Sequence, residues 1–263
     1  MRDPRTTPDP DLVSVSDPKR VTVPVADLHR TPTGPRDRQL IYGDPVTVLQ
    51  HDGNWRLIKS EKDGYCGYVM ADVLGAPAIA THAVTARMTQ AYAAPDIKSS
   101  DRVTLSFGSR LTAIAETPIF IETELGHIPR QHLHRTSDTA TDPIAVASLF
   151  LGTPYLWGGN SGWGLDCSAL VQWACHACNI PCPGDTDLQQ AALGRNLPEG
   201  TPYARGDLIF WKGHVALVMD AGTMIHANAG HMAVTEEGIE AGIARILTQG
   251  DGPVTGHKRL PRP

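Results

Sequence analysis

Short runs of alternating apolar and polar residues fill the first half of the chain. Between residues 21 and 76 these runs are separated by turn-forming sequences at Gly43-Asp44-Pro45, Asp52-Gly53-Asn54 and Asp63-Gly64. Such alternation is typical of half-buried strands, and closely spaced turns join strands into hairpins. The pattern predicts a small β-barrel over residues 21–76 and a second, more diverged β-barrel over residues 80–136.

The pattern changes near residue 140. Residues 144–150 place apolar side chains at helical spacing, and residues 165–178 do so again after a glycine-rich turn. Three strand-like segments follow, at residues 207–212, 214–220 and 223–229. Helices followed by a set of strands predict an α+β domain over residues 140–263. Residues 1–20, rich in Pro, Asp, Arg and Thr, are expected to form a poorly ordered or draped tail.

The composition excludes several classes of function. Hydrophobic residues make up 41% and charged residues 19% of the chain, and the net charge of −5 leaves no basic surface for nucleic acid. No apolar run is long enough to span a bilayer, so we expect no membrane partner. The N-terminus carries charge and proline where a secretory signal has an apolar core. With an odd number of cysteines, five, we expect free thiols and a cytoplasmic location.

Cys167 lies in the segment GTPYLWGGNSGWGLDCSAL, at the predicted first turn of a helix. The amides and the dipole at a helix N-terminus stabilise a thiolate and lower the pKa of a thiol. The preceding glycines allow the backbone to approach a substrate closely. These conditions suit a cysteine nucleophile, although a buried structural cysteine is the alternative at this point.

Two histidines follow in the predicted strands. His214 begins an alternating strand, and an imidazole can take a thiol proton near neutral pH. His226 lies twelve residues later, and an even separation can place both side chains on one face of a hairpin. A third polar group that orients the base is the usual logic of a catalytic triad. Spacing alone does not establish contact between the rings, because a chain with eleven histidines contains chance pairs.

Together these segments resemble the NlpC/p60-type papain-like cysteine peptidases. That family carries a D-C-S motif on a helix, then a G-H pair on a strand, then a third polar residue. The matches are Asp166-Cys167-Ser168, Gly213-His214, His226-Ala227, Tyr155-x-Trp157-Gly158-Gly159 and Gly206-Asp207. The resemblance covers residues 143 to 260, and DGYCGYVMADVL resembles the end of a bacterial SH3-like module. It implies an α+β protein with two small SH3-like β-barrels followed by a papain-like peptidase domain.

The resemblance implies Cys167 as nucleophile, His214 as base and His226 as the residue that orients it, with Tyr155 as an oxyanion donor. The implied reaction is cleavage of the γ-D-glutamyl–diamino acid bond in cell-wall peptides, L-Ala-γ-D-Glu-diamino acid, through a thioester. The free L-Ala amine needs acidic groups beside it, because a buried unpaired ammonium costs several kcal/mol. The implied substrate-binding residues are Asp166, Ser168, Trp157, Asp185, Thr186, Tyr65 and Asp37.

Three alternatives stay open. The segment CHACNIPC contains a Cys-x-x-Cys pair that is suggestive of zinc, although Cys175 and Cys178 fall on or near the predicted buried stripe. The SH3-like region could bind wall peptides beside an inactive C-terminal domain. The same fold could also carry an acyltransferase or amidase. We expect a monomer without cofactor or metal.

Overall fold

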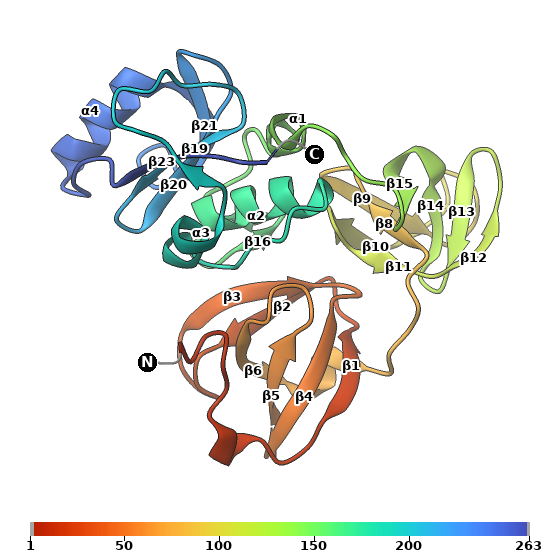
Figure 1. Ribbon diagram of the computed structural model, residues 1–263. Helices are drawn as coiled ribbons and strands as arrows, with labels where there is room; N and C mark the ends of the chain where they lie inside the picture. The colour runs from red at the N-terminus through yellow and green to blue at the C-terminus, as the bar shows by residue number, and fades with distance from the viewer. Residues whose placement is uncertain (1–2, 262–263) are drawn as a thin grey trace. The chain divides into compact units, whose positions relative to one another are not determined.

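The computed structural model describes residues 3–261; residues 1–2 of the predicted tail and residues 262–263 of the predicted catalytic domain lie outside the described residues. Its internal contacts divide the chain into two units. The first unit runs to Asp138 and includes residues 160–162, and the second comprises residues 139–159 and 163–263. Figure 1 shows the two β modules of the first unit in red to green and the mixed second unit in green to blue.

The first β module is one antiparallel sheet in the order β3-β2-β6-β5-β4-β1-β7. Its strands are β1 (Asp17–Val21), β2 (Val25–His29), β3 (Arg36–Ile41), β4 (Pro45–Asp52), β5 (Trp55–Ser60), β6 (Cys66–Met70) and β7 (Leu74–Gly75). Two 3₁₀ turns, η1 (Pro10–Leu12) and η2 (Ala71–Val73), accompany them. Gly43, Gly53 and Gly64 have positive φ at the predicted turns, which confirms those turn assignments.

The first strand begins earlier than predicted. Residues 17–20, assigned from the sequence to the tail, pair with Pro45–Val48 of β4. The amides of Ser14 and Val15 both donate to the carbonyl of Leu49. The expectation of poor order is therefore wrong for these residues, because the free edge of β4 offers their backbone hydrogen-bond partners.

The second β module contains two antiparallel sheets, in the orders β10-β9-β14-β13-β12 and β11-β8-β15. The elements are β8 (His82–Val84), β9 (Met88–Tyr92), β10 (Asp101–Ser106), β11 (Arg110–Leu111), β12 (Ala113–Glu116), β13 (Phe120–Thr123), β14 (Gly126–Pro129), η3 (Arg130–His132) and β15 (Leu133–Arg135). Tyr42, which follows β3 of the first module, is buried in this second core. Its hydroxyl donates to Glu124 at 3.2 Å, and its carbonyl accepts from the amide of Arg110 at 3.0 Å. The two modules therefore share a core residue.

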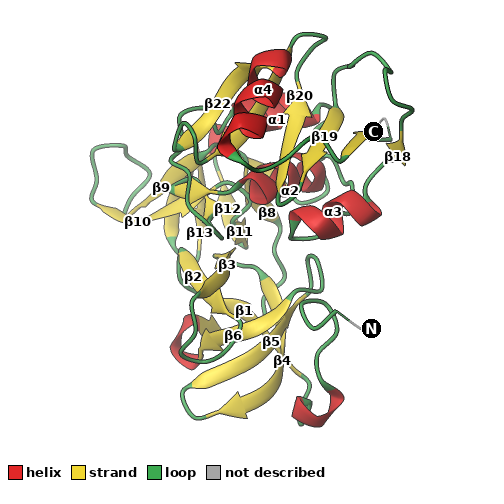
Figure 2. Cartoon of the chain, turned by 90° about the vertical axis from the view of Figure 1, so that its left-hand side faces the viewer, coloured by secondary structure: helices red, strands yellow, loops and turns green. Residues whose placement is uncertain are grey.

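Within the described residues, the second unit combines four helices with an antiparallel sheet in the order β18-β23-β19-β20-β21-β22. Figure 2 shows its helices in red and its strands in yellow. The helices are α1 (Pro143–Ser148), α2 (Cys167–Ala177), α3 (Thr186–Ala192) and α4 (Ile239–Gln249). The strands are β17 (Gly164–Leu165), β18 (Arg195–Asn196), β19 (Asp207–Trp211), β20 (His214–Val218), β21 (Thr223–Asn228), β22 (Ala233–Gly238) and β23 (Gly256–Arg259); β16 (Asn160–Ser161) falls among residues 160–162 of the first unit. The predicted α+β character is confirmed, as are the helix at 165–178 and the three strands.

Both faces of the central sheet are covered. Ile209 and Trp211 of β19 pack with Ile239 and Ile246 of α4, while α2 packs against β20 and β21. Every residue of β19 is buried, as expected for a strand with helices or chain on both sides. None of the helices within residues 3–261 combines the length and apolar character that crossing a bilayer requires.

Asp207 begins β19 and is fully buried. Nε and Nη2 of Arg259 donate to its two oxygens at 2.7 and 2.8 Å, and Nε2 of His257 lies 2.8 Å from Oδ2. Burial alone would raise the pKa of Asp207, but these hydrogen bonds outweigh it and hold the pKa below its usual value. The carboxylate therefore adds stability above the unfolded pKa, near 4, and that contribution is lost as pH falls through the lower folded pKa.

We predict that Asp207→Asn lowers the free energy of unfolding by about 2 kcal/mol at pH 7, since Arg259 and His257 lose their anionic acceptor. Urea unfolding of both proteins at pH 7 and at pH 3 measures the effect. The difference should shrink at the lower pH. An equal difference at both pH values would contradict the ionic role.

Candidate active site

Helix α2 begins at Cys167 because Asp166 caps it. Oδ1 of Asp166 accepts from the amide of Ala169 and from the hydroxyl of Ser168, both at 2.8 Å. Oδ2 accepts from the amide of Gly158 at 3.1 Å. A side-chain cap is worth about 1 kcal/mol to a helix. This carboxylate also joins the glycine loop to the first turn of the helix.

The sulfur of Cys167 lies against the strand that carries His214. Cys167 is 7% exposed, and its Sγ is 3.8 Å from Oγ1 of Thr186 and 3.9 Å from the carbonyl oxygen of Gly213. A backbone hydrogen bond from Val215 also reaches the thiol. Two of these three contacts therefore come from the residues on either side of His214. Within the described residues, no histidine ring is hydrogen-bonded to this thiol.

The two predicted histidines are in contact. Nε2 of His214 is 2.9 Å from Nδ1 of His226, and Nε2 of His226 is 3.0 Å from Oε2 of Glu237. The antiparallel register, which pairs Leu217 with Ile225, brings β20 and β21 together at this point. The structure thus settles the ring contact that spacing left open. It leaves Nδ1 of His214 as the nitrogen available to a thiol.

Burial keeps both reacting groups neutral in this conformation. It raises the pKa of the Cys167 thiol to about 12, with the charge of Asp166 adding to the effect. It also lowers the pKa of His214 to about 3, reinforced by the neighbouring His226. The expectation of a lowered thiol pKa is therefore wrong for this conformation, because desolvation outweighs the hydrogen bonds to the sulfur. The resting site holds a thiol and a neutral imidazole.

Tyr155 is held close to the nucleophile. Its amide donates to the carbonyl of Met232 at 3.0 Å, and it forms a parallel bridge with Leu165. Burial raises its pKa, and the charge of Asp166, together with that of Cys167 whenever this thiol ionises, raises it further. The phenol therefore stays protonated at neutral pH and can donate a hydrogen bond. The oxyanion role that the resemblance implied for Tyr155 stays a prediction.

The other predicted substrate residues of the second unit fall into two groups. Thr186, at the first position of α3, is buried against the sulfur, and Asp185 precedes it at the cap position without a capping hydrogen bond. Ser168 is buried and donates to Asp166, whereas Trp157 is 70% exposed. Thr186 and Ser168 thus border the nucleophile directly.

Tyr65 and Asp37, predicted from the first module, lie together there. The Tyr65 hydroxyl is 3.4 Å from Oδ2 of Asp37. Nε and Nη2 of Arg30 donate to the two oxygens of the same carboxylate, each at 3.0 Å. Any ammonium that binds Asp37 must therefore share it with a guanidinium.

The CHACNIPC segment has a structural role. Nε2 of His176 is 2.9 Å from the carbonyl oxygen of Cys182, and Nε2 of Gln172 donates to that oxygen at 3.1 Å. Because a carbonyl only accepts, Nε2 of His176 carries a hydrogen there and has no lone pair for a metal. Across residues 3–261, no group of three His, Cys, Asp or Glu side chains is arranged to hold a metal ion.

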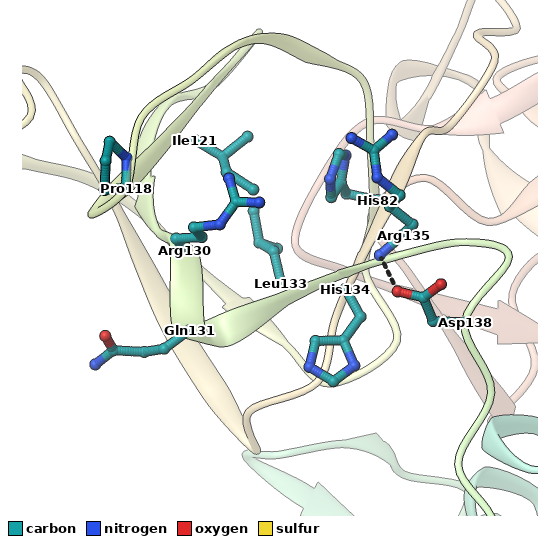
Figure 3. Close-up of a pocket in the computed structure, with 9 residues that line it drawn as sticks. All are labelled: His82, Pro118, Ile121, Arg130, Gln131, Leu133, His134, Arg135 and Asp138. Atoms are coloured by element: carbon teal, nitrogen blue, oxygen red, sulfur yellow. Dashed lines mark hydrogen bonds between the residues drawn. The ribbon is translucent and has the colours of Figure 1, made fainter.

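A cavity of about 410 Å³ lies in the second β module (Figure 3). Its nine lining residues include two histidines and two arginines but no cysteine, serine or threonine. Arg130 and Arg135 share the carboxylate of Glu116 at 2.9 and 3.0 Å. A cavity without a nucleophile, whose cations are already paired, is a poor candidate for the chemistry assembled around Cys167.

Two family models match the chain. The model of the NlpC/P60 family matches residues 152–247, and that of the bacterial dipeptidyl-peptidase SH3 domain matches residues 28–74. The predicted peptidase domain and the first SH3-like module are thereby confirmed.

Curated relatives and a solved structure agree with this assignment. A γ-D-glutamyl-L-lysine dipeptidyl-peptidase of Bacillus subtilis is 30% identical over 213 residues, covering 72% of this chain and 71% of the relative. Dipeptidyl-peptidase 6 of Lysinibacillus sphaericus is 28% identical over 73% of this chain and 80% of its own length. The crystal structure of an NlpC/P60 family protein from Bacillus cereus aligns with a TM-score of 0.77 and 22% identity, covering 93% of this chain and 100% of that one, which supports the fold.

Sequence reasoning missed Glu237, which completes the hydrogen-bonded row behind His214. The segment AVTEEG alternates as a strand and places Glu237 opposite Met224 of β21. The sequence alone does not give the length of the turn between β21 and β22. A shift of one residue in that turn would place Glu236 instead of Glu237 on the sheet face that carries His226.

We predict that alkylation of Cys167 by iodoacetamide in the free enzyme rises about tenfold for each pH unit between 7 and 9. The reason is that the thiolate fraction grows in that proportion below a high pKa. Rates should be followed by mass spectrometry, with Cys167→Ala identifying reaction at the other thiols. A plateau below pH 8 would mean that the resting thiol is already ionised.

Proposed function

We propose that this chain, which belongs to the NlpC/P60 family of cysteine peptidases, hydrolyses the γ-D-glutamyl–diamino acid bond of cell-wall peptides with a free N-terminal L-Ala. The observation that carries the proposal is the thiol of Cys167 lying against the backbone on both sides of His214, whose ring is in turn bonded to His226. The relatives' printed activity supports the choice of bond. The complete Cys-His-His set favours an enzyme over a binding module.

The geometry favours proton transfer that accompanies attack. The sulfur of Cys167 would attack the amide carbon while Nδ1 of His214 takes the thiol proton. A hydrogen bond between these atoms would have to tighten in the substrate complex, as is common for catalytic contacts that are loose in the free enzyme. The imidazolium would then protonate the leaving amine of the diamino acid. Water, activated by the same ring, would hydrolyse the thioester and restore the thiol.

Two donors support the negative oxygen that forms during attack. The backbone N–H of Cys167 lies in the first turn of α2, where amides have no intrahelical acceptor. The protonated Tyr155 hydroxyl is the second donor. Fixed donors of this kind stabilise charge that develops only in the transition state.

The free amine would be held by carboxylates near the cysteine. Asp166 already accepts three hydrogen bonds. It would therefore attract the ammonium of the substrate mainly through its negative charge, without a direct hydrogen bond. Asp185 is half-buried and directly precedes Thr186, whose hydroxyl lies 3.8 Å from the sulfur of Cys167. We propose Asp185 as the principal amine ligand of the second unit. The assignment of Tyr65 and Asp37 to the same amine stays a prediction from the sequence.

We further propose that residues 80–136 form a second, diverged SH3-like barrel, which their two antiparallel sheets and separate core support. None of the five cysteines is in a disulfide, which supports a cytoplasmic location. A monomer with the wall peptide as its partner remains our expectation.

We predict that free L-Ala-γ-D-Glu-diamino acid is cleaved at least about 100-fold faster than its N-acetylated form, because acetylation removes the charge that the carboxylates would hold. Product masses after incubation with each peptide measure this, for both L-lysine and diaminopimelate. Cys167→Ala serves as the inactive control with intact fold. Equal rates for the two peptides would contradict amine recognition.

We predict that Tyr155→Phe lowers kcat by about 100-fold with little change in KM, because an oxyanion donor acts in the transition state rather than on bound substrate. Steady-state kinetics on the free peptide provide the measurement. A rise in KM at constant kcat would instead make Tyr155 a substrate-binding residue.

A further inference from the structure

The row of hydrogen bonds behind His214 continues beyond the two histidines to an ion pair. Oε2 of Glu237 lies 3.0 Å from Nε2 of His226 and accepts from Nη2 of Arg245 at 2.7 Å. Nε of Arg245 donates to Oε1 at 2.8 Å, so the guanidinium binds both carboxylate oxygens of Glu237. Glu237 comes from β22 and Arg245 from α4, two elements that carry none of the predicted site residues.

The ion pair determines where the hydrogens of the two imidazoles lie. Arg245 keeps Glu237 ionised, and the pKa of this carboxyl is held below its usual value chiefly by that hydrogen bond. An ionised carboxylate only accepts, so Nε2 of the neutral His226 must carry its hydrogen. Nδ1 of His226 then has the lone pair and accepts from Nε2 of His214. The remaining lone pair of His214 is on Nδ1.

We propose that Glu237 and Arg245 are positioning residues for the proposed peptidase reaction, which set the tautomers of His226 and His214 so that Nδ1 of His214 can accept the thiol proton. The opposite tautomer of His226 would present a hydrogen to Nε2 of His214. His214 would then carry its own hydrogen on Nδ1 and could not act as the base. Of the two partners, Glu237 favours the imidazolium that forms on His214 after proton transfer, whereas Arg245 opposes it.

The packing around the ion pair leaves little room for other arrangements. His226 is fully buried, and the side chains of Glu237 and Arg245 are 12% and 23% exposed. A Cβ built on Gly242 of α4 would lie 3.1 Å from Oε2 of Glu237 and would overlap Cε of Met224. The helix therefore approaches the carboxylate closely because position 242 has no side chain.

Other charges act on the same row. The titratable groups that influence these rings or the guanidinium, besides the members of the row, are His231 after β21 and Asp251 after α4. His231 lowers the pKa of His226, and Asp251 raises that of Arg245. Glu237 is the carboxylate that raises the pKa of both histidines.

The test uses the full chain with Glu237→Gln, the double variant Glu237→Met/Arg245→Met, and Glu236→Gln as a matched control. Glu236 immediately precedes Glu237 in β22 and carries the same charge. Its side chain is exposed and makes no hydrogen bond to the described residues of the row. The double variant replaces the ion pair by apolar side chains, an exchange that folded proteins often tolerate. Thermal unfolding monitored by circular dichroism identifies any variant that fails to fold.

On the free tripeptide, Glu237→Gln should lower kcat about tenfold and the double variant about 100-fold, each with KM changed less than about twofold. The acid limb of kcat/KM should move to lower pH in Glu237→Gln, because removal of the carboxylate lowers the pKa of the base. It should not do so in the double variant, which also removes the Arg245 guanidinium that lowers this pKa. Glu236→Gln should retain wild-type kcat and the wild-type pH profile. Loss of stability alone would change neither the pH profile nor the split between kcat and KM.

Nitrogen-15 spectra of the ring nitrogens test the tautomers without any substrate. The wild type should show His226 protonated on Nε2, and the double variant a mixture of both forms. Hydrogen on Nδ1 of His226 in the wild type, or wild-type kcat in the double variant, would overturn the proposal. If the wild type fails to cleave the peptide, the proposed function is wrong, while the ring spectra still decide the role of the ion pair.

Discussion

The carboxylate of Asp166 connects two pieces of chain that must stay together for Cys167 to react. It accepts from Gly158 in the glycine loop and from Ala169 and Ser168 in the first turn of α2. The segment that leads into the loop carries Tyr155, and the helix carries the thiol and the backbone N–H of Cys167. Cys167 and the two proposed oxyanion donors are therefore held by one half-buried carboxylate. The cost is its negative charge, which makes ionisation of the neighbouring thiol harder.

Burial explains the rest of the site. A sheet covered on both faces places His214 and His226 where water cannot satisfy their nitrogens, so each must find a protein partner. The row ends at the Glu237–Arg245 ion pair, in which the Glu237 carboxylate is the hydrogen-bond partner of Nε2 of His226. The same desolvation leaves the resting thiol and imidazole neutral. This is why the proposed reaction couples proton transfer to attack on the substrate and does not use an ion pair formed beforehand.

The sequence predicted the local elements well and their mutual contacts less well. Helical spacing and alternation located α2 and the strands that carry His214 and His226, because these patterns depend on neighbouring residues. The thiol pKa was predicted in the wrong direction, since the helix start was visible in the sequence but the burial of Cys167 was not. Glu237 was missed because its place in the row depends on the register across a turn. Asp37 was named, but its pairing with Arg30 was not foreseen.

Tyr42 has a consequence for how such proteins can be assembled from parts. Its ring belongs to the core of the second β module although its backbone belongs to the first, and the amide of Arg110 binds its carbonyl. Gly43 beside it has no space for a side chain, because a Cβ there would meet the backbone of Arg110. Recombination that exchanged residues 21–76 alone would remove an aromatic ring from a core encoded elsewhere. Gene fusions and grafts should therefore transfer both β modules as one piece.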